Sequence, residues 1–200
     1  KPPVLWDVLE ALPPGPAGER DAALLLVGFV GALRRSELAA ARVEDLVEDE
    51  RGLVLEIPVS KTDQYAAGQV VVLPRAGRPG RCPVTALRRW LATAGAGSGP
   101  IFRPVHRSGA VQARAMTEAN INRAVQRACE RALGPDHGLD GGRRYSAHSL
   151  RAGFVTYAAE RGLSERAIAR QTRHRSTATV AQYVRHTSAW TDNAATALGL

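Results

Sequence analysis

Lysine is almost absent from this chain of 200 residues. Of the 27 Lys and Arg residues, only Lys1 and Lys61 are lysines, and the other 25 are arginines. The sequence therefore places arginine wherever a positive charge alone is sufficient. Lys61 lies in the polar segment "VSKTDQYAAG", residues 59–68, and a general need for positive charge does not explain it.

Cysteine and long apolar runs are also scarce. Cys82 and Cys129 lie far apart and fit no metal-ligand spacing such as C-x-x-C, and two cysteines do not make a disulfide framework in a chain of this length. The longest apolar run, residues 22–33, is too short to cross a bilayer and predicts a buried helix. Residues 1–16 lack the apolar core of a signal peptide. We therefore expect a protein of the reducing cytoplasm.

The chain is strongly basic. Its net charge is +8 and its pI is near 10.4, whereas its apolar fraction of 44% and charged fraction of 23% are ordinary for a soluble domain. The length suits one domain with a substantial core, or two small ones. The basic excess indicates an acidic partner, with nucleic acid the commonest and an anionic membrane surface the alternative. An arginine-rich composition with a merely solvated basic face is the third interpretation.

The hydrophobic pattern predicts an α+β fold, mostly α-helical with one small antiparallel β-sheet. Two β-rich runs flank Lys61 and place it near the tip of a hairpin. The helix from Glu19 is apolar on nearly every face and must be largely buried, and Ser36 is expected to cap the helix after it. Strands are predicted at residues 52–60 and 68–74, and helices within 2–16 and at 19–33, 37–46, 82–95, 117–133, 147–161, 164–172, 176–185 and 187–200.

Arg34 is the first candidate for a functional charge. It stands where the buried helix ends, so its guanidinium lies at the edge of the core, where an unpaired charge is costly. A structural ion pair with Glu37 or Asp45 is the favoured interpretation when the residue is considered alone. The functional alternative is a guanidinium held rigidly so that its two-pronged donor geometry can receive a phosphate.

The C-terminal third contains two further candidate groups. In "SAHSLRAGF", His148 and Arg151 are three residues apart and share one face of a helix, although chance often supplies H-x-x-R. In "QTRHRSTATVAQYVR", His174 precedes Tyr183 by nine residues. Alone, Tyr183 is best explained as an aromatic anchor of an amphipathic helix and His174 as a loop or cap residue.

Together these residues form a chemically coherent set. Two arginines can neutralise the non-bridging oxygens of a phosphodiester, two histidines can donate hydrogen bonds or transfer a proton, and a tyrosine can attack phosphorus. Such a set needs no metal ion, because the arginines take the role that Mg²⁺ has elsewhere. Its members are Arg34, Lys61, His148, Arg151, His174 and Tyr183.

At these residues the chain resembles the catalytic domain of the tyrosine recombinases (phage integrase family), which cut and rejoin DNA through a 3′-phosphotyrosyl intermediate. Almost the whole chain takes part, through "RDAALLLVGFVGALRRSELAAARVEDL", "SKTDQYAAG", "HSLRAGF" and "HRSTATVAQY", in the family's order and spacing. The resemblance implies the following roles: Arg34 as first arginine, Lys61 as catalytic lysine, His148 and Arg151 as the H-x-x-R pair, His174 as final histidine, Tyr183 as nucleophile and Glu37 as the acidic brace of Arg34.

The resemblance also implies the partners. They are double-stranded DNA, which would associate the protein with the nucleoid, and other copies of the chain, monomeric alone and assembled into a synaptic tetramer on DNA. No cofactor is implied. Residues 1–200 correspond to the catalytic domain without the family's N-terminal DNA-clamping domain, and residues 187–200 to a tail that docks on a neighbouring subunit. One departure is Arg173, where the family usually has glycine. Its bulky charge is expected to shift His174 or to add a DNA contact.

Three other functions fit parts of the pattern. A type IB topoisomerase shares the chemistry but relaxes supercoils without joining two sites. A DNA-binding regulator with a degenerate recombinase fold would bind DNA and form no covalent adduct. A metal-dependent nuclease is the weakest alternative, because the His and Asp residues show no ligand spacing.

The identity of Lys61 generates the first testable prediction. Strand cleavage must protonate the departing 5′-oxygen, and arginine holds its proton too tightly, whereas lysine has a lower and readily shifted pKa. If Lys61 is the general acid, Lys61→Arg is expected to cleave DNA ~10²–10⁴-fold more slowly than the parent chain, which single-turnover cleavage measures. Cleavage at the parent rate would instead assign Lys61 a simple phosphate contact.

Overall fold

In the computed structural model, the described residues are 2–57, 68–137, 144–173 and 181. Lys61 and most of the predicted helices at 176–185 and 187–200 lie outside them. The elements are α1 (Pro2–Glu10), α2 (Pro16–Val30), α3 (Arg35–Ala40), the 3₁₀ turn η1 (Val43–Asp45), β1 (Leu46–Asp49), β2 (Gly52–Ile57), β3 (Gln69–Pro74), the 3₁₀ turn η2 (Pro79–Arg81), α4 (Pro83–Thr93), α5 (Glu118–Leu133), α6 (Ala147–Glu160) and α7 (Glu165–Thr172).

The sheet is antiparallel, with strand order β1-β2-β3. The predicted strands at 52–60 and 68–74 correspond to β2 and β3, whose paired register runs from Gly52 opposite Pro74 to Ile57 opposite Gln69. The predicted helix at 37–46 is wrong in its second half, because α3 ends at Ala40, the 3₁₀ turn η1 follows, and β1 begins at Leu46. The backbone N–H of Arg42 donates to Oδ2 of Asp45 at 3.0 Å, so this segment forms a separate capped turn instead of continuing the helix.

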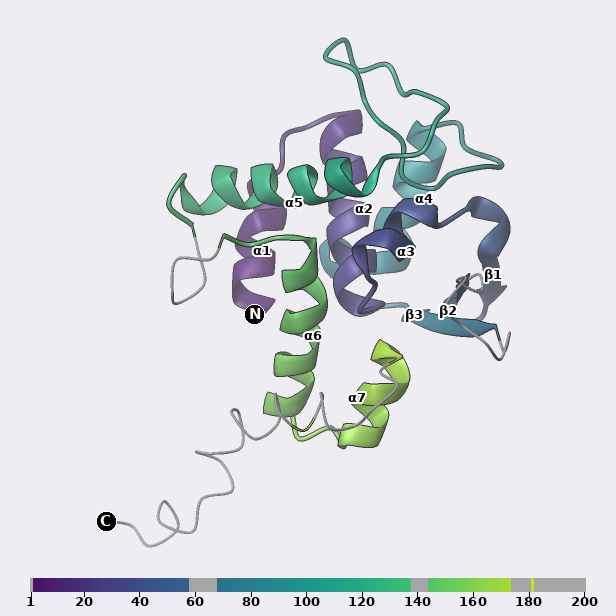
Figure 1. Ribbon diagram of the computed structural model, residues 1–200. Helices are drawn as coiled ribbons and strands as arrows, with labels where there is room; N and C mark the ends of the chain where they lie inside the picture. The colour runs from purple at the N-terminus through teal and green to yellow at the C-terminus, as the bar shows by residue number, and fades with distance from the viewer. Residues whose placement is uncertain (1, 58–67, 138–143, 174–180, 182–200) are drawn as a thin grey trace, which may run out of the picture.

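Helix α2 is the centre of the core. It packs against α4 on one side and against α6, α5 and α1 on others, and α5 crosses α1 and α2 (Figure 1). This arrangement confirms the prediction of a buried helix and explains why α2 is apolar on nearly every face. Gly28 permits a close approach, since a Cβ at this position would lie 2.8 Å from Cδ1 of Leu150 on α6 and 3.2 Å from Cδ1 of Leu38 on α3.

The end of α2 differs from the prediction and shapes the site. The helix stops at Val30 instead of continuing to residue 33. The N–H of Ala32 then donates to the Phe29 carbonyl (3.1 Å) and the N–H of Leu33 to the Gly28 carbonyl (3.1 Å). This is a Schellman turn, with Ala32 in the left-handed conformation (φ 45°) that glycine usually adopts. The chain therefore reverses direction three residues earlier than expected.

The cap of α3 also differs. Ser36 lies inside the first turn, and Arg34 is the N-cap residue. The backbone N–H of Arg34 donates to Oε2 of Glu37 at 2.7 Å. The carboxylate of Glu37, three positions later, thus satisfies the backbone N–H of Arg34, as in a capping box.

The two cysteines are buried free thiols. Cys82 is the N-cap of α4, and its Sγ accepts the N–H of Thr85 at 3.5 Å. Burial raises the pKa of Cys129 to about 11. Within the described ranges, no helix is long and apolar enough to cross a membrane.

The start of α2 generates a stability prediction. A Cβ on Gly18 would lie 1.8 Å from the carbonyl oxygen of Pro13, so Gly18→Ala must displace backbone. Although alanine normally stabilises a helix interior relative to glycine, we expect this substitution to lower the free energy of unfolding by more than about 1 kcal/mol. Urea unfolding measures the change. Gly97→Ala is the control, because a Cβ there meets nothing within 4 Å. An equal loss of unfolding free energy in both variants would contradict the close contact between residue 18 and the Pro13 carbonyl.

Candidate active site

A cleft of about 530 Å³ lies where the N-terminal ends of α3, α5 and α6 meet. It brings Arg34 together with His148 and Arg151, which lie more than a hundred positions later in the sequence. His148 is exposed and Arg151 is buried, so the imidazole is accessible from the cleft while the guanidinium is held in the interior. The lining residues are Leu33, Arg34, Arg35, Ser36, Glu118, Asn122, Ser146, His148 and Arg151.

The first turn of α6 is fastened to its surroundings. The N–H of Ser146 donates to Oγ of Ser149 at 3.0 Å, and the N–H of Ala147 donates to Oδ1 of Asn122 on α5 at 3.0 Å. These bonds orient the helix so that its N-terminal end, where the helix dipole is positive, faces the cleft. A helix N-terminus beside guanidinium groups favours an anion such as a phosphate.

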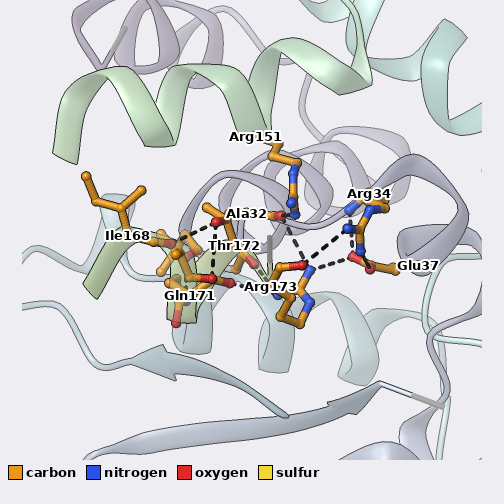
Figure 2. Close-up of polar contacts among 11 residues, drawn as sticks. Ala32, Arg34, Glu37, Arg151, Ile168, Gln171, Thr172 and Arg173 are labelled. Carbon is orange, nitrogen blue, oxygen red and sulfur yellow. Dashed lines mark hydrogen bonds and ion pairs between the residues drawn. The ribbon is translucent and has the colours of Figure 1, made fainter. Parts of the chain in front are cut away.

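Side chains from α6, from α7 and from the residue after α7 donate hydrogen bonds to three successive carbonyls at the end of α2. Nε2 of Gln171 donates to the Val30 carbonyl (2.9 Å), Nη1 of Arg173 to the Gly31 carbonyl (3.2 Å) and Nη1 of Arg151 to the Ala32 carbonyl (2.8 Å). The last carbonyls of a helix have no partner within the helix and carry partial negative charge. The carbonyl groups at the end of α2 therefore bind the guanidinium groups of Arg151 and Arg173, as Figure 2 shows.

Glu37 joins the guanidinium groups of Arg34 and Arg173. Its Oε1 accepts Nη1 of Arg34 at 2.6 Å, and its Oε2 accepts Nη2 of Arg173 at 2.6 Å. Burial alone would raise the pKa of Glu37, but Arg173 and Arg34 together hold it below its usual value. Asp45, the alternative partner considered for Arg34, instead accepts the backbone N–H of Arg42.

Exposure distinguishes the two guanidinium groups. The side chain of Arg34 is 46% exposed, whereas that of Arg173 is 4% exposed and that of Glu37 is 11% exposed. Arg34 can therefore contact a ligand in the cleft while Glu37 fixes its orientation. Arg173 faces the interior, so the expectation that it adds a DNA contact is wrong. The reason is that α7 ends against α2, where carbonyls and Glu37 attract its guanidinium.

The structure unites some of the predicted residues. Arg34, His148 and Arg151 line one cleft, and Glu37 forms an ion pair with Arg34. Lys61, His174 and Tyr183 are outside the described residues, and their roles stay predictions. Sequence reasoning missed the structural role of Arg173, although an arginine directly after a helix, at a position suited to glycine, was a signal.

Arg35 and Glu118 form a second pair in the cleft that the sequence did not reveal. Nε of Arg35 on α3 lies 2.9 Å from Oε2 of Glu118 at the start of α5. Both side chains are about half exposed, at 50% and 49%. A solvent-exposed pair of this kind contributes little stability, so it can open when a ligand enters.

Sequence comparison supplies the family. The sequence profile of the Phage integrase family matches residues 4–189, nearly the whole chain. The chain belongs to the phage integrase family. An integrase/recombinase XerD homolog from Selenomonas ruminantium is 37% identical over 178 residues, which are 89% of this chain and 50% of the relative. The chain thus spans about half the length of this curated relative.

Solved structures of recombinases and integrases share the fold. XerA recombinase superposes with a TM-score of 0.65 at 18% identity, over 92% of this chain and 57% of its own. XerH site-specific recombinase bound to its difH substrate gives 0.64 at 18% identity, over 92% and 50%. A lambda integrase dimer bound to a COC′ core site gives 0.61 at 16% identity, over 90% and 45%. The predicted α+β fold of a tyrosine recombinase catalytic domain is therefore confirmed.

The shared carboxylate generates a pH-dependent prediction. Because the folded-state pKa of Glu37 is lowered, its ion pairs stabilise the fold above the unfolded-state pKa, about 4.3, and this stabilisation is lost as pH falls through the folded-state pKa. At neutral pH, Glu37→Gln is expected to lower the free energy of unfolding by about 3 kcal/mol, because Arg173 stays buried without a counter-charge. The difference from the parent should shrink at acidic pH, as urea unfolding followed by circular dichroism at both pH values measures.

The control for this prediction is Glu118→Gln. It also removes a carboxylate paired with arginine, but both partners are about half exposed. We expect a change below about 1 kcal/mol with little pH dependence. Equal losses in the two variants would show that the burial of Glu37 does not set the strength of its ion pairs.

Proposed function

We propose that this domain cuts and rejoins strands of double-stranded DNA through a covalent phosphotyrosyl intermediate. The hydroxyl oxygen of Tyr183 attacks the phosphorus of a phosphodiester and gives its proton to a histidine of the site. The bond from phosphorus to the 5′-oxygen breaks, and Lys61 protonates that oxygen. The 5′-hydroxyl of a partner strand then attacks the phosphotyrosyl linkage and releases Tyr183. Each step exchanges one phosphodiester for another, so no nucleotide triphosphate is consumed.

The observation that carries this proposal is the convergence of Arg34, Arg151 and His148 at the N-terminus of α6. A phosphodiester undergoing attack gains negative charge on its non-bridging oxygens, and donors that are already oriented stabilise that charge without reorganisation. The Glu37 carboxylate orients Arg34, and the Ala32 carbonyl orients Arg151. The site thus has the preorganisation that phosphoryl transfer requires, and the arginines supply the charge that a metal ion supplies elsewhere.

DNA is the substrate that best fits the charge and the relatives. The net charge of +8 favours a polyanion. Of the proteins with the same fold, XerH is bound to its difH substrate and lambda integrase is bound as a dimer to a COC′ core site. We propose that this chain also acts on double-stranded DNA, assembles there into a synaptic tetramer, and uses residues 187–200 to dock on a neighbouring subunit.

Covalent trapping tests the proposal. The chain is incubated in EDTA with end-labelled duplexes that carry a nick beside a randomised sequence, because the short product diffuses away and preserves the adduct. We expect a protein–DNA band on a denaturing gel that is lost in Tyr183→Phe. The control is Tyr157→Phe on α6, whose hydroxyl accepts Nη2 of Arg161 at 2.6 Å and which does not line the cleft.

The remaining outcomes distinguish the alternatives. Binding to the duplexes without any covalent band would identify a DNA-binding regulator. If the protein forms the adduct and relaxes plasmid DNA but never joins two duplexes, it is a topoisomerase. Cleavage abolished by EDTA would overturn the proposal in favour of a metal-dependent nuclease.

A further inference from the structure

Two residues other than glycine have positive φ angles in the described part of the chain, and they contact each other. Ala32 (φ 45°) completes the turn after α2, and Arg173 (φ 55°) follows α7. Nη2 of Arg173 lies 3.5 Å from the Ala32 carbonyl oxygen. Left-handed backbone is strained for residues with a Cβ, and such strain is commonly found at functional sites. The junction of α2 and α7 therefore holds two strained positions side by side.

The backbone conformation at Arg173 explains why this position favours glycine. Its N–H donates to the Ala169 carbonyl, which closes the αL motif at the end of α7. Glycine is the usual residue at this point, because it adopts the left-handed conformation without steric conflict. Arginine adds two further costs here: its guanidinium is desolvated, and its Nε finds no acceptor among the described residues. Favourable contacts of the guanidinium group must offset these costs.

The contacts of the Arg173 guanidinium supply the offset. Nη1 donates to the Gln171 carbonyl (2.8 Å) and to the Gly31 carbonyl (3.2 Å), and Nη2 donates to Oε2 of Glu37 (2.6 Å). The carboxylate of Glu37 also holds the side chain and the backbone N–H of Arg34. Arg173 thus ties α7 to the end of α2 and to the start of α3.

Arg173 is connected to two of the arginines that line the cleft, Arg34 and Arg151, through shared acceptors. Arg34 shares Glu37 with it, and Arg151 shares the Ala32 carbonyl with it. In addition, the carbonyl of Arg173 itself accepts Nη2 of Arg34 at 3.4 Å. A shift of Arg173 would therefore move the acceptors that orient both guanidinium groups. We infer that Arg173 is a positioning residue, which fixes Arg34 and Arg151 on the scissile phosphate in the proposed strand-transfer reaction.

The inference rests on the proposed function, and three substitutions test it. Arg173→Gly relieves the backbone strain and removes the guanidinium. Arg173→Lys keeps a charge but lacks the planar fork that contacts several acceptors at once. Arg170→Met is the control, because it removes an exposed charge from the last turn of the same helix. Circular dichroism establishes that each variant folds.

The measurement separates DNA affinity from the rate of adduct formation at saturating DNA. We expect Arg173→Gly to bind the nicked duplexes within about twofold of the parent and to form the adduct at least ~10-fold more slowly, with Arg173→Lys between the two. Arg170→Met should keep the parent rate. Equal rates for the parent and Arg173→Gly would overturn the inference and leave the proposed function intact.

A second substrate distinguishes positioning from a general structural role. A methylphosphonate at the scissile linkage replaces one charged non-bridging oxygen with a methyl group, so less charge needs neutralisation by the arginines. If Arg173 acts by orienting Arg34 and Arg151, the defect of Arg173→Gly should shrink on this substrate. An undiminished defect would indicate that Arg173 only supports the fold.

A measurement without DNA keeps the inference testable if the parent forms no adduct, the outcome that overturns the proposed function. The guanidinium Nε–H signals of Arg34 and Arg151 in ¹⁵N NMR spectra report how firmly each side chain is held. We expect them to broaden or shift in Arg173→Gly and to stay unchanged in Arg170→Met. Signals identical to those of the parent in Arg173→Gly would overturn the positioning role by themselves.

Discussion

The largely buried carboxylate of Glu37 lies between two guanidinium groups and fixes the orientation of Arg34 at the cleft. Arg34 and Arg173 have the same charge and would repel each other in a junction that excludes much of the solvent. Glu37 bonds to both, at 2.6 Å each, and converts the repulsion into a network with a defined geometry. Removing it would leave a buried charge without compensation, which is far more destabilising than the loss of a surface pair. Because Glu37 fixes one side of Arg34, the exposed part of Arg34 faces the cleft in one orientation.

The rigid core transmits this geometry to the site. Helix α2 is enclosed by other helices, and its last residue together with the turn after it presents the carbonyls of Val30, Gly31 and Ala32 to side chains of α6, α7 and Arg173. Close-packed interiors resist deformation, so these acceptors have fixed positions. Arg151 is buried, and its Nη1 donates to the Ala32 carbonyl. This bond holds its guanidinium beside the cleft. The site is thereby built against a helix enclosed by the core, which suits a reaction that depends on orientation.

The scarcity of lysine also has a structural aspect. Arginine keeps its charge when buried, whereas a buried lysine tends to lose its proton. Arg151 and Arg173 are both buried and have to remain charged to hold or receive anionic groups. Arginine is therefore the appropriate residue at these positions. The same property makes it unsuitable as a proton donor, which is the role predicted for Lys61.

The sequence by itself determined the fold class, the buried character of α2, the antiparallel pair of β2 and β3 and the family, because hydrophobic periodicity and ordered motifs are local features of the chain. It also identified Arg34, His148 and Arg151 as candidates, since their residue types and spacing were visible. Only the tertiary structure decided how these side chains are held. The early stop of α2 is local, since the Schellman turn joins Gly28 and Phe29 to Leu33 and Ala32, but the pattern did not reveal it because alanine stands where glycine is usual. The inward direction of Arg173, in contrast, depends on acceptors from segments more than a hundred residues away. Such acceptors become neighbours only when the helices pack, and no local pattern in the sequence records them.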